Sequence, residues 1–259
     1  MNNFDQLIKN AKVTRNKLAK TDELYWIEKD NKKYVLRIFK DKKHLNRCLQ
    51  LYKKLGNKEF LPKLLASKKN KIIVEFIDGR ECTKKDASSL AEKIGRICGI
   101  INKIKKIGDY TTEKNFAGYI KAMIKEEYIS EKFAKKINDF RANLTKKIKL
   151  EITMDANDLY PKNFKVFNNK VYMVDIGAIK PLPKGLGIAK GFSRWFKTPE
   201  QQQKFLSGYG KENSLKFFTK DYKKLITLQF LMRRLGIRAI MKLNTNIRKD
   251  LRSLKELIK

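Results

Sequence analysis

The chain has 259 residues, of which 42% are hydrophobic, so it is long enough to bury a core in one large domain or in two lobes. Lys and Arg number 61 against 27 Asp and Glu, a net charge of +34 that favours an anionic partner such as nucleic acid, anionic lipid or a phosphorylated compound. A single histidine, His44, and three cysteines without CxxC spacing argue against Ser-His catalysis and histidine-rich metal sites. Because the lysines are spread over the whole chain, a bias in composition explains the charge equally well.

The hydropathy of the chain predicts a cytoplasmic protein. The N-terminal stretch MNNFDQLIKNAKV lacks the apolar core of a signal peptide, and no stretch approaches the ~20 apolar residues of a membrane span. The cysteines are expected to be reduced and half-buried. We therefore expect a soluble protein, or one that lies peripherally at the inner membrane face.

The first eighty residues are predicted to be rich in strands. Residues 24–29, LYWIEK, and 34–39, YVLRIF, flank the turn DNKK and predict a β-hairpin. A helix is expected over 44–55, with Gly56 as its stop. Its predicted apolar face consists of Leu45, Cys48, Leu49, Tyr52 and Leu55. LPKLLAS and KIIVEFIDGRE predict two more strands, so this part should be a small, mostly antiparallel sheet carrying one helix.

Beyond Glu81 the apolar residues recur at helical spacing. Helices are expected from about Asp86 and over 115–129 and 131–148, and the Gly/Pro-rich stretch PLPKGLGIAKG is expected to be a loop. A basic helical tail is expected from about Asp221. Its apolar stripe, formed by Leu225, Leu228, Leu231 and Leu235, predicts core packing. Its basic residues leave open a second interpretation, contact with an anionic membrane or RNA.

Three oxygen-bearing side chains lie in a short polar segment before the tail. Asp158 and Asn163 are in the loop ANDLYPKN, and Asp175 follows the strand pair FKVF and VYMVD, which would bring it back beside that loop. Phosphoryl transfer needs a carboxylate that orients the attacking hydroxyl and hard oxygen ligands for Mg²⁺. Each residue taken alone could equally be a turn former.

The order of these residues resembles the small-molecule branch of the protein-kinase-like superfamily, which holds aminoglycoside phosphotransferases and choline kinases, with lipopolysaccharide kinases as near relatives. The loop of that branch typically reads His-Gly-Asp-Leu-His-Pro-x-Asn, and here residues 156–163 read Ala-Asn-Asp-Leu-Tyr-Pro-Lys-Asn. The Asp-x-Gly motif that follows is Asp175-Ile176-Gly177. By this resemblance Asp158 is the catalytic aspartate, and Asn163 and Asp175 bind Mg²⁺.

The resemblance also implies a fold and a nucleotide site. The fold is α+β and two-lobed, with a small antiparallel β N-lobe in residues 1–80 and a larger, mainly helical C-lobe in residues 81–259. Arg37 takes the place of the phosphate-binding lysine. The ATP adenine would meet the backbone around Glu75, Phe76 and Ile77.

Three positions depart from the family pattern. Residues 10–29 contain no glycine where a Gly-rich loop would cover the phosphates, so this backbone cradle is either missing or replaced by side chains such as Arg15, Asn16 and Lys17. The helix after Arg37 has no acid to pair with it, and Gln50 is the nearest substitute. Ala156 stands where the loop histidine usually lies.

Two functional hypotheses follow. The first is a Mg-ATP-dependent phosphotransferase acting on a hydroxyl of an anionic small molecule or glycolipid, with a lipopolysaccharide sugar as the expected acceptor. The second is a catalytically impaired kinase-like module that binds anionic lipid, glycan or nucleic acid. Trp195 and Phe196 form an aromatic-basic patch that suits a lipid interface or plain packing. A protein kinase is disfavoured because no APE-like segment follows Asp175.

Overall fold

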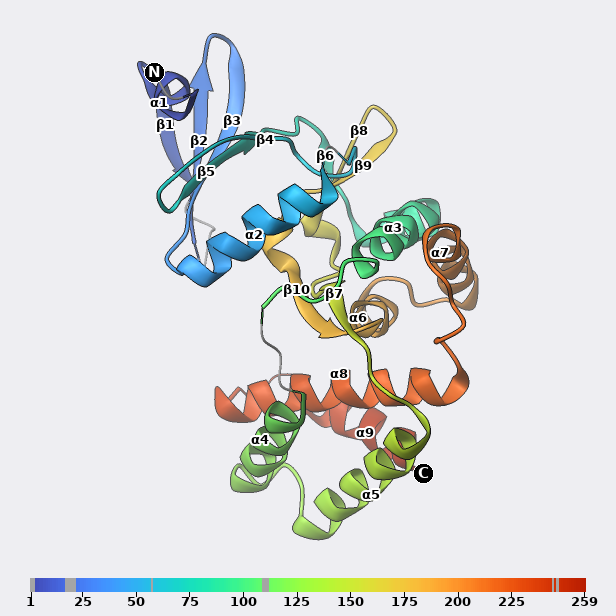
Figure 1. The fold of residues 1–259 in the computed structure, drawn as a ribbon. Helices are drawn as coiled ribbons and strands as arrows, with labels where there is room; N and C mark the ends of the chain where they lie inside the picture. The colour runs from blue at the N-terminus through green and yellow to red at the C-terminus, as the bar shows by residue number, and fades with distance from the viewer. Residues whose placement is uncertain (1–2, 17–21, 57, 109–111, 244, 246) are drawn as a thin grey trace. The chain divides into compact units, whose positions relative to one another are not determined.

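The computed structural model of the protein describes residues 3–16, 22–56, 58–108, 112–243, 245 and 247–259 (Figure 1). Its contacts divide the chain into two compact units. The first contains residues 1–90 and 160–179, and the second contains residues 91–159 and 180–259. The first unit therefore includes residues 160–179. The sequence analysis placed the boundary between the lobes at residue 80, so it assigned these residues to the second lobe.

The first unit is built on a five-stranded antiparallel sheet with the order β1-β2-β3-β5-β4. The strands are β1 (Lys12–Asn16), β2 (Glu23–Lys29), β3 (Lys32–Ile38), β4 (Leu64–Lys68) and β5 (Lys71–Glu75). The predicted hairpin is confirmed as β2 and β3. Asp30 and Asn31 connect these strands with φ of 49° and 56°, the left-handed conformation that a tight hairpin turn favours.

Two helices accompany this sheet. The short helix α1 (Asn3–Ile8), which the sequence analysis did not predict, packs Phe4 into a core with Ile27, Leu36 and Ile73 of the sheet. The predicted helix is confirmed as α2 (Lys42–Leu55), and Gly56 ends it with a φ of 58°. Its buried face is formed by Leu45, Cys48, Leu51, Tyr52 and Leu55. The assignment of Leu49 to this face was wrong, because that side chain is only half-buried while Leu51 is fully buried.

A second, three-stranded antiparallel sheet has the order β6-β8-β9. It consists of β6 (Arg80–Glu81), β8 (Phe164–Phe167) and β9 (Lys170–Met173). The last two are the predicted strand pair after the polar loop. The 3-10 turn η1 (Lys84–Asp86) follows β6, η2 (Pro161–Asn163) precedes β8, and η3 (Ile176–Ala178) follows β9.

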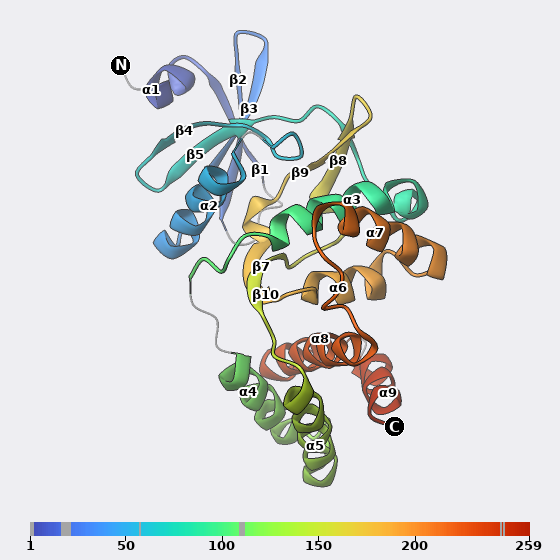
Figure 2. The same cartoon turned by 45° about the vertical axis from the view of Figure 1, so that its right-hand side comes forward.

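The second unit is mainly helical. Its helices are α3 (Ala87–Asn102, which starts in the first unit), α4 (Thr112–Lys125), α5 (Glu131–Lys147), α6 (Leu186–Arg194), α7 (Pro199–Glu212), α8 (Lys220–Ile240) and α9 (Ile247–Ile258). The strands β7 (Ile152–Ala156) and β10 (Ile179–Pro183) pair with each other. Helices α4, α5, α6 and α9 pack against α8, as Figure 2 shows.

The prediction for the tail is confirmed, whereas the prediction for the Gly/Pro-rich stretch is wrong. The leucine stripe of the tail is buried, so the core interpretation is confirmed. Trp195 and Phe196 are 3% and 0% exposed, which confirms plain packing and excludes them from a lipid interface. The predicted loop was wrong, because its residues belong to β10 and α6. Gly185, with a φ of 78°, turns the chain between these two elements.

No helix in the described part of the chain combines the length and the apolar character needed to cross a bilayer.

Candidate active site

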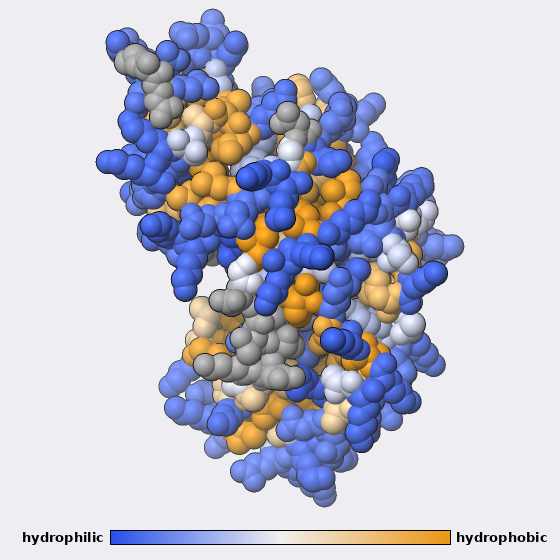
Figure 3. Space-filling view, viewed as in Figure 1, coloured by the Kyte–Doolittle hydropathy of each residue, from blue (hydrophilic) through white to orange (hydrophobic). Residues whose placement is uncertain are grey.

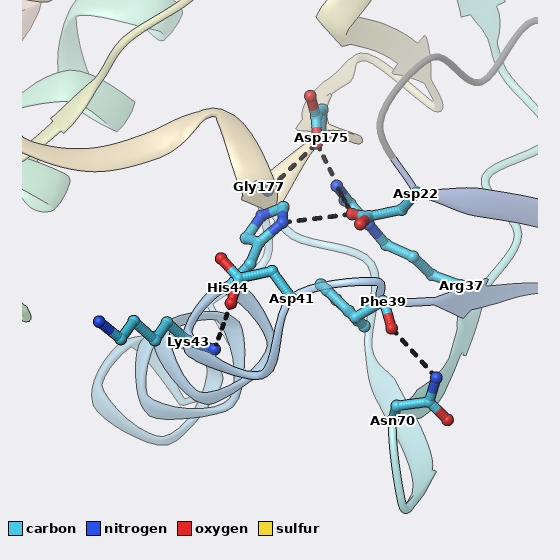
Figure 4. Close-up of polar contacts among 9 residues, drawn as sticks. All are labelled: Asp22, Arg37, Phe39, Asp41, Lys43, His44, Asn70, Asp175 and Gly177. Atoms are coloured by element: carbon cyan, nitrogen blue, oxygen red, sulfur yellow. Dashed lines mark hydrogen bonds and ion pairs between the residues drawn. The ribbon is translucent and has the colours of Figure 1, made fainter.

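The first unit holds a guanidinium group between two carboxylates. Arg37 on β3 donates from Nε to Asp22 Oδ2 at 2.8 Å, and its NH2 group lies 2.8 Å from the same oxygen. Its NH1 group donates to Asp175 Oδ1 at 3.0 Å (Figure 4). Burial lowers the pKa of Arg37, but the charges of Asp175 and Asp22 raise it by more, so the net pKa is above its usual value. The three side chains form one charged network.

A histidine and a glycine complete this network. His44, in the first turn of α2, places Nδ1 3.3 Å from Asp22 Oδ2, and its ring stands edge-on against Phe39. The Gly177 N–H donates to Asp175 Oδ1 at 3.1 Å. A Cβ atom at Gly177 would lie 2.6 Å from Arg37 NH2 and 2.8 Å from His44 Nε2. Glycine is therefore required at this position for the side chains to approach as closely as they do.

The two predicted metal ligands are held by neighbouring backbone. Asn163 ends the 3-10 turn η2, and the Val174 N–H donates to the Asn163 carbonyl oxygen at 3.0 Å. Asp175, the next residue, caps η3. The backbone thus ties the loop that carries Asn163 to the strand end that carries Asp175.

The donor atoms of Asn163 and Asp175 fit Mg²⁺, which prefers oxygen ligands. Among the described residues, no group of three or more His, Cys, Asp or Glu side chains is arranged to hold a metal ion. Mg²⁺ is usually bound through one or two carboxylates together with substrate phosphates and water. The residues present therefore suit an ion that arrives with a nucleotide.

The predicted adenine segment follows the end of β5. Glu75 closes that strand, and its N–H donates to the Lys63 carbonyl oxygen at 2.9 Å. The Ile77 carbonyl oxygen accepts a hydrogen bond of 3.0 Å from Lys165 Nζ, which also lies 4.9 Å from the centre of the Phe76 ring. Lys165, which the sequence analysis did not single out, would lie beside a base bound at this segment.

The second unit contains Asp158 and the start of the polar loop. Asp158 Oδ1 accepts a hydrogen bond of 3.1 Å from Arg194 NH1, at the end of α6. Lys190, also on α6 and only 8% exposed, donates to the Asn157 carbonyl oxygen at 2.5 Å and to Asn157 Oδ1 at 2.8 Å. Burial lowers the pKa of Lys190 to about 7, and the charges of Arg233 and Arg194 add to this effect.

A buried carboxylate anchors the same loop to α6. Asp155 accepts hydrogen bonds from the Gly185 N–H at 2.8 Å and the Gly187 N–H at 3.0 Å. Burial raises the pKa of Asp155 to about 6, although hydrogen bonds from Asn102, Gly185 and Gly187 oppose the shift. Ala156 carries no polar side chain, and Asp155 and Lys190 hold the loop on either side of it.

Of the predicted site residues, the structure brings Arg37 and Asp175 into contact and ties the backbone of Asn163 to Val174. The predicted substitute Gln50 is exposed, and Asp22 pairs with Arg37 instead. Of the side chains proposed to replace a Gly-rich loop, Arg15 and Asn16 belong to β1, and Lys17 lies outside the described residues.

The sequence analysis missed five residues of these two clusters: Asp22, His44, Lys165, Lys190 and Arg194. Their partners lie between 15 and 88 positions away in the sequence, so no local pattern marks them. The one available signal was Lys190, a charged residue within the otherwise small and apolar stretch GLGIAKG.

Solved structures of small-molecule kinases are similar to this chain, although no protein-family model and no curated protein sequence matches it. Choline kinase from Cryptosporidium parvum Iowa II is 16% identical with a TM-score of 0.69, over 96% of this chain and 90% of that chain. The streptomycin–ATP–APH(2″)-IIa ternary complex is 14% identical with a TM-score of 0.67, over 95% and 94%. Amicoumacin kinase hAmiN in complex with AMP-PNP, Ca²⁺ and Ami is 15% identical with a TM-score of 0.64, over 95% and 86%.

These likenesses show the fold. The chain has an α+β, protein-kinase-like fold, similar to the folds of the choline kinase and APH(2″)-IIa structures. The predicted fold class is confirmed.

Proposed function

We propose that the protein is a Mg-ATP-dependent phosphotransferase that acts on a hydroxyl group of an anionic small molecule or glycolipid. The observation that carries this proposal is the contact between Arg37 and Asp175. These residues are 138 positions apart in the sequence, yet the fold places a cation suited to phosphate groups beside a carboxylate suited to Mg²⁺. A fold alone does not specify function, whereas these side chains have the chemistry that phosphoryl transfer needs.

Each residue has a distinct task in this proposal. Asp158 orients the acceptor hydroxyl and accepts its proton while the hydroxyl oxygen bonds to the γ-phosphorus of ATP and the bond from that phosphorus to the ADP oxygen breaks, which releases ADP. Asn163 and Asp175 would hold Mg²⁺, which would supply positive charge to the triphosphate. Arg37 directs positive charge towards the phosphates, and the backbone from Glu75 to Ile77 receives the adenine.

The charges around Asp158 favour an anionic acceptor. Arg194 pairs with Asp158, and the charges of Arg194 and Arg233 both act on Lys190. Helix α6, which carries Lys190 and Arg194, packs against α8, which carries Arg233. Two arginine side chains thus lie near the loop that carries the half-exposed carboxylate of Asp158. A phosphate or carboxylate group on the acceptor would balance this excess, which supports a sugar of a lipopolysaccharide or another glycolipid.

The end of α8 supports a peripheral contact with an anionic membrane. Four apolar side chains in this region are exposed, namely Ile237 (36%), Ile240 (62%), Met241 (60%) and Leu243 (43%). No acidic residue occurs between Asp221 and Asp250, and Lys242 lies within the exposed group. Apolar side chains beside cations suit the boundary of an anionic bilayer better than nucleic acid. Hydrophilic residues cover most of the face shown in Figure 3.

The test is Mg-ATP binding measured by thermal unfolding of wild type, Asp175→Asn and Asp139→Asn. A ligand at about 100 times its Kd adds about 2.7 kcal/mol of stability, which raises the Tm of a chain of this size by roughly 5–10 °C. Wild type and the Asp139→Asn control, whose exposed carboxylate on α5 is remote in sequence from the site, should show this rise. Asp175→Asn should lose most of it.

Two results would contradict the proposal in different ways. An equal rise in all three proteins would show that Asp175 is not a metal ligand. No rise in any of them would leave the protein without a nucleotide site and favour the binding module, whose affinity for anionic vesicles should fall steeply with salt. For an active enzyme, Asp158→Asn should bind Mg-ATP normally and fail to transfer phosphate.

A further inference from the structure

We propose that Asp22 is a positioning residue that controls how strongly Arg37 holds Asp175, and thereby keeps Asp175 available to a metal ion. This inference rests on the proposed function, because it concerns the same nucleotide site. It assigns to a residue just before β2 the task of balancing the Arg37 charge, for which the helix that follows Arg37 offers no acid.

The geometry divides the guanidinium of Arg37 between its two partners. Its Nε and NH2 atoms both lie 2.8 Å from Asp22 Oδ2, while its NH1 atom lies 3.0 Å from Asp175 Oδ1 (Figure 4). Two of the three nitrogen atoms therefore face Asp22. Since the guanidinium is planar and rigid, these two contacts fix its orientation and limit the contact with Asp175 to one nitrogen.

Burial distinguishes the two carboxylates. The Asp22 side chain is 4% exposed and the Arg37 side chain is 13% exposed, whereas the Asp175 side chain is 41% exposed. A ligand arriving from solvent can therefore reach Asp175 but not Asp22. Asp22 therefore remains paired with Arg37, whereas Asp175 can contact both Arg37 and a metal ion.

The charge balance explains why this sharing matters. A cation paired with a single carboxylate holds it strongly, and Mg²⁺ would have to compete with that cation for Asp175. With Asp22 present, the Arg37 charge is already compensated, so its hold on Asp175 weakens. Removal of Asp22 would leave a buried guanidinium whose only charged partner in this network is the intended metal ligand.

Helix α2 contacts Asp22 through a histidine, because the helix has no acidic residue of its own. His44 reaches Asp22 Oδ2 from the first turn of this helix, with Nδ1 at 3.3 Å. The helix thus contacts the ion pair through the acid rather than supplying the acid itself. Phe39 packs on the other components of the network, since the Arg37 guanidinium lies 5.0 Å from the centre of its ring and the His44 ring stands 5.1 Å away.

The experiment is a calorimetric titration of ATP, with and without Mg²⁺, into wild type, Asp22→Asn and Asp41→Asn. Asp22→Asn should weaken Mg-ATP binding at least about tenfold, the usual effect of removing a residue that orients a metal ligand. Its effect on metal-free ATP should be much smaller. Asp41→Asn is the matched control, because it exchanges the same atoms in the same part of the unit. Asp41 caps α2 by accepting the Lys43 N–H at 2.8 Å, and asparagine caps equally well.

A second comparison distinguishes the positioning of Arg37 by Asp22 from a loss of folding. It does not require the single variant Asp22→Asn to fold. The double variant Asp22→Asn/Arg37→Gln removes both charges together, so it leaves no unpaired buried charge, and it is compared with Arg37→Gln alone. If Asp22 acts through Arg37, the two proteins should bind Mg-ATP with the same affinity. A further loss in the double variant would overturn the proposal.

The remaining outcomes are also distinct. If wild type binds Mg-ATP and Asp22→Asn binds it equally well, Asp22 has no positioning task and the proposed function stands. If wild type itself does not bind Mg-ATP, the proposed function is wrong, and the assignment of Asp22 is overturned with it.

Discussion

Lys190→Met should change how the stability of the protein depends on pH. Lys190 is buried, and its pKa is lowered to about 7 from an ordinary value of 10.5. The unfolded chain therefore holds more protons than the folded chain between these two values. Consequently the Lys190 contribution to stability is fully present above about pH 10.5 and is lost as the pH falls towards about 7.

The magnitude follows from the difference between the two pKa values. They differ by 10.5 − 7 = 3.5, and one pKa unit corresponds to about 1.4 kcal/mol, so the full effect is about 5 kcal/mol. As the pH rises from about 7 to 10, the amine of the unfolded chain still holds most of its proton. The folded protein should therefore gain about 3 kcal/mol of the full effect in free energy of unfolding over this range. Methionine has a similar length and no titratable group, so this gain should disappear in the variant.

The assay is urea unfolding of wild type and Lys190→Met at several pH values in this window. The difference in free energy of unfolding between the two proteins removes the titration of every other group. The free energy of unfolding of wild type, relative to that of Lys190→Met, should increase by about 3 kcal/mol from the lower to the higher pH. The control Lys121→Met, at an exposed position on α4, should run parallel to wild type. A Lys190→Met difference that stays constant within about 0.5 kcal/mol would refute the reasoning.

Two further predictions concern glycines. Gly177→Ala should lower stability by about 1–3 kcal/mol and weaken Mg-ATP binding, because the new Cβ atom would lie 2.6 Å from Arg37 NH2; calorimetry and thermal unfolding test both effects. Gly236→Ala on α8 should lower the Tm, since its Cβ atom would lie 2.3 Å from Tyr119 Cβ on α4. Gly118→Ala, on the same α4 with no atom within 4 Å of the new Cβ, should instead raise stability by about 0.5–1 kcal/mol. If both α-helical variants move the Tm in the same direction, the close approach of α4 and α8 is not what restricts position 236.

The elements that the sequence predicted are those marked by local signals. Alternation around the Asp30-Asn31 turn marked the hairpin of β2 and β3, and helical spacing marked α2 and α8. In contrast, α1 has only six residues, too few for a period to show. The stretch that forms β10 and α6 was predicted to be a loop because it is rich in glycine and proline. Gly187 is instead a point of close approach, where a Cβ atom would lie 2.2 Å from Asp155 Oδ1.

The residues of the candidate site also fall into those marked by a local sequence pattern and those that are not. Asp158, Asn163 and Asp175 were recognisable because their order and spacing lie within eighteen residues of sequence. Asp22 and Lys190 were not, because their tasks depend on partners brought to them by folding. No spacing rule connects Asp22 with Arg37, or Lys190 with Asn157, and only the structure reveals that each is buried in a hydrogen-bonded pair.

The departures from the family pattern have physical replacements in two of three cases. The helix after Arg37 lacks an acid, and Asp22 supplies the carboxylate from the other side of the guanidinium. The loop lacks its histidine, and Lys190 supplies a donor to the Asn157 carbonyl oxygen while Asp155 binds two backbone N–H groups. An unpaired buried charge costs several kcal/mol, so each replacement has to satisfy the polar groups around it. Arg37 thus keeps a carboxylate partner and the loop keeps a side-chain donor, although both come from parts of the chain other than those of the family pattern.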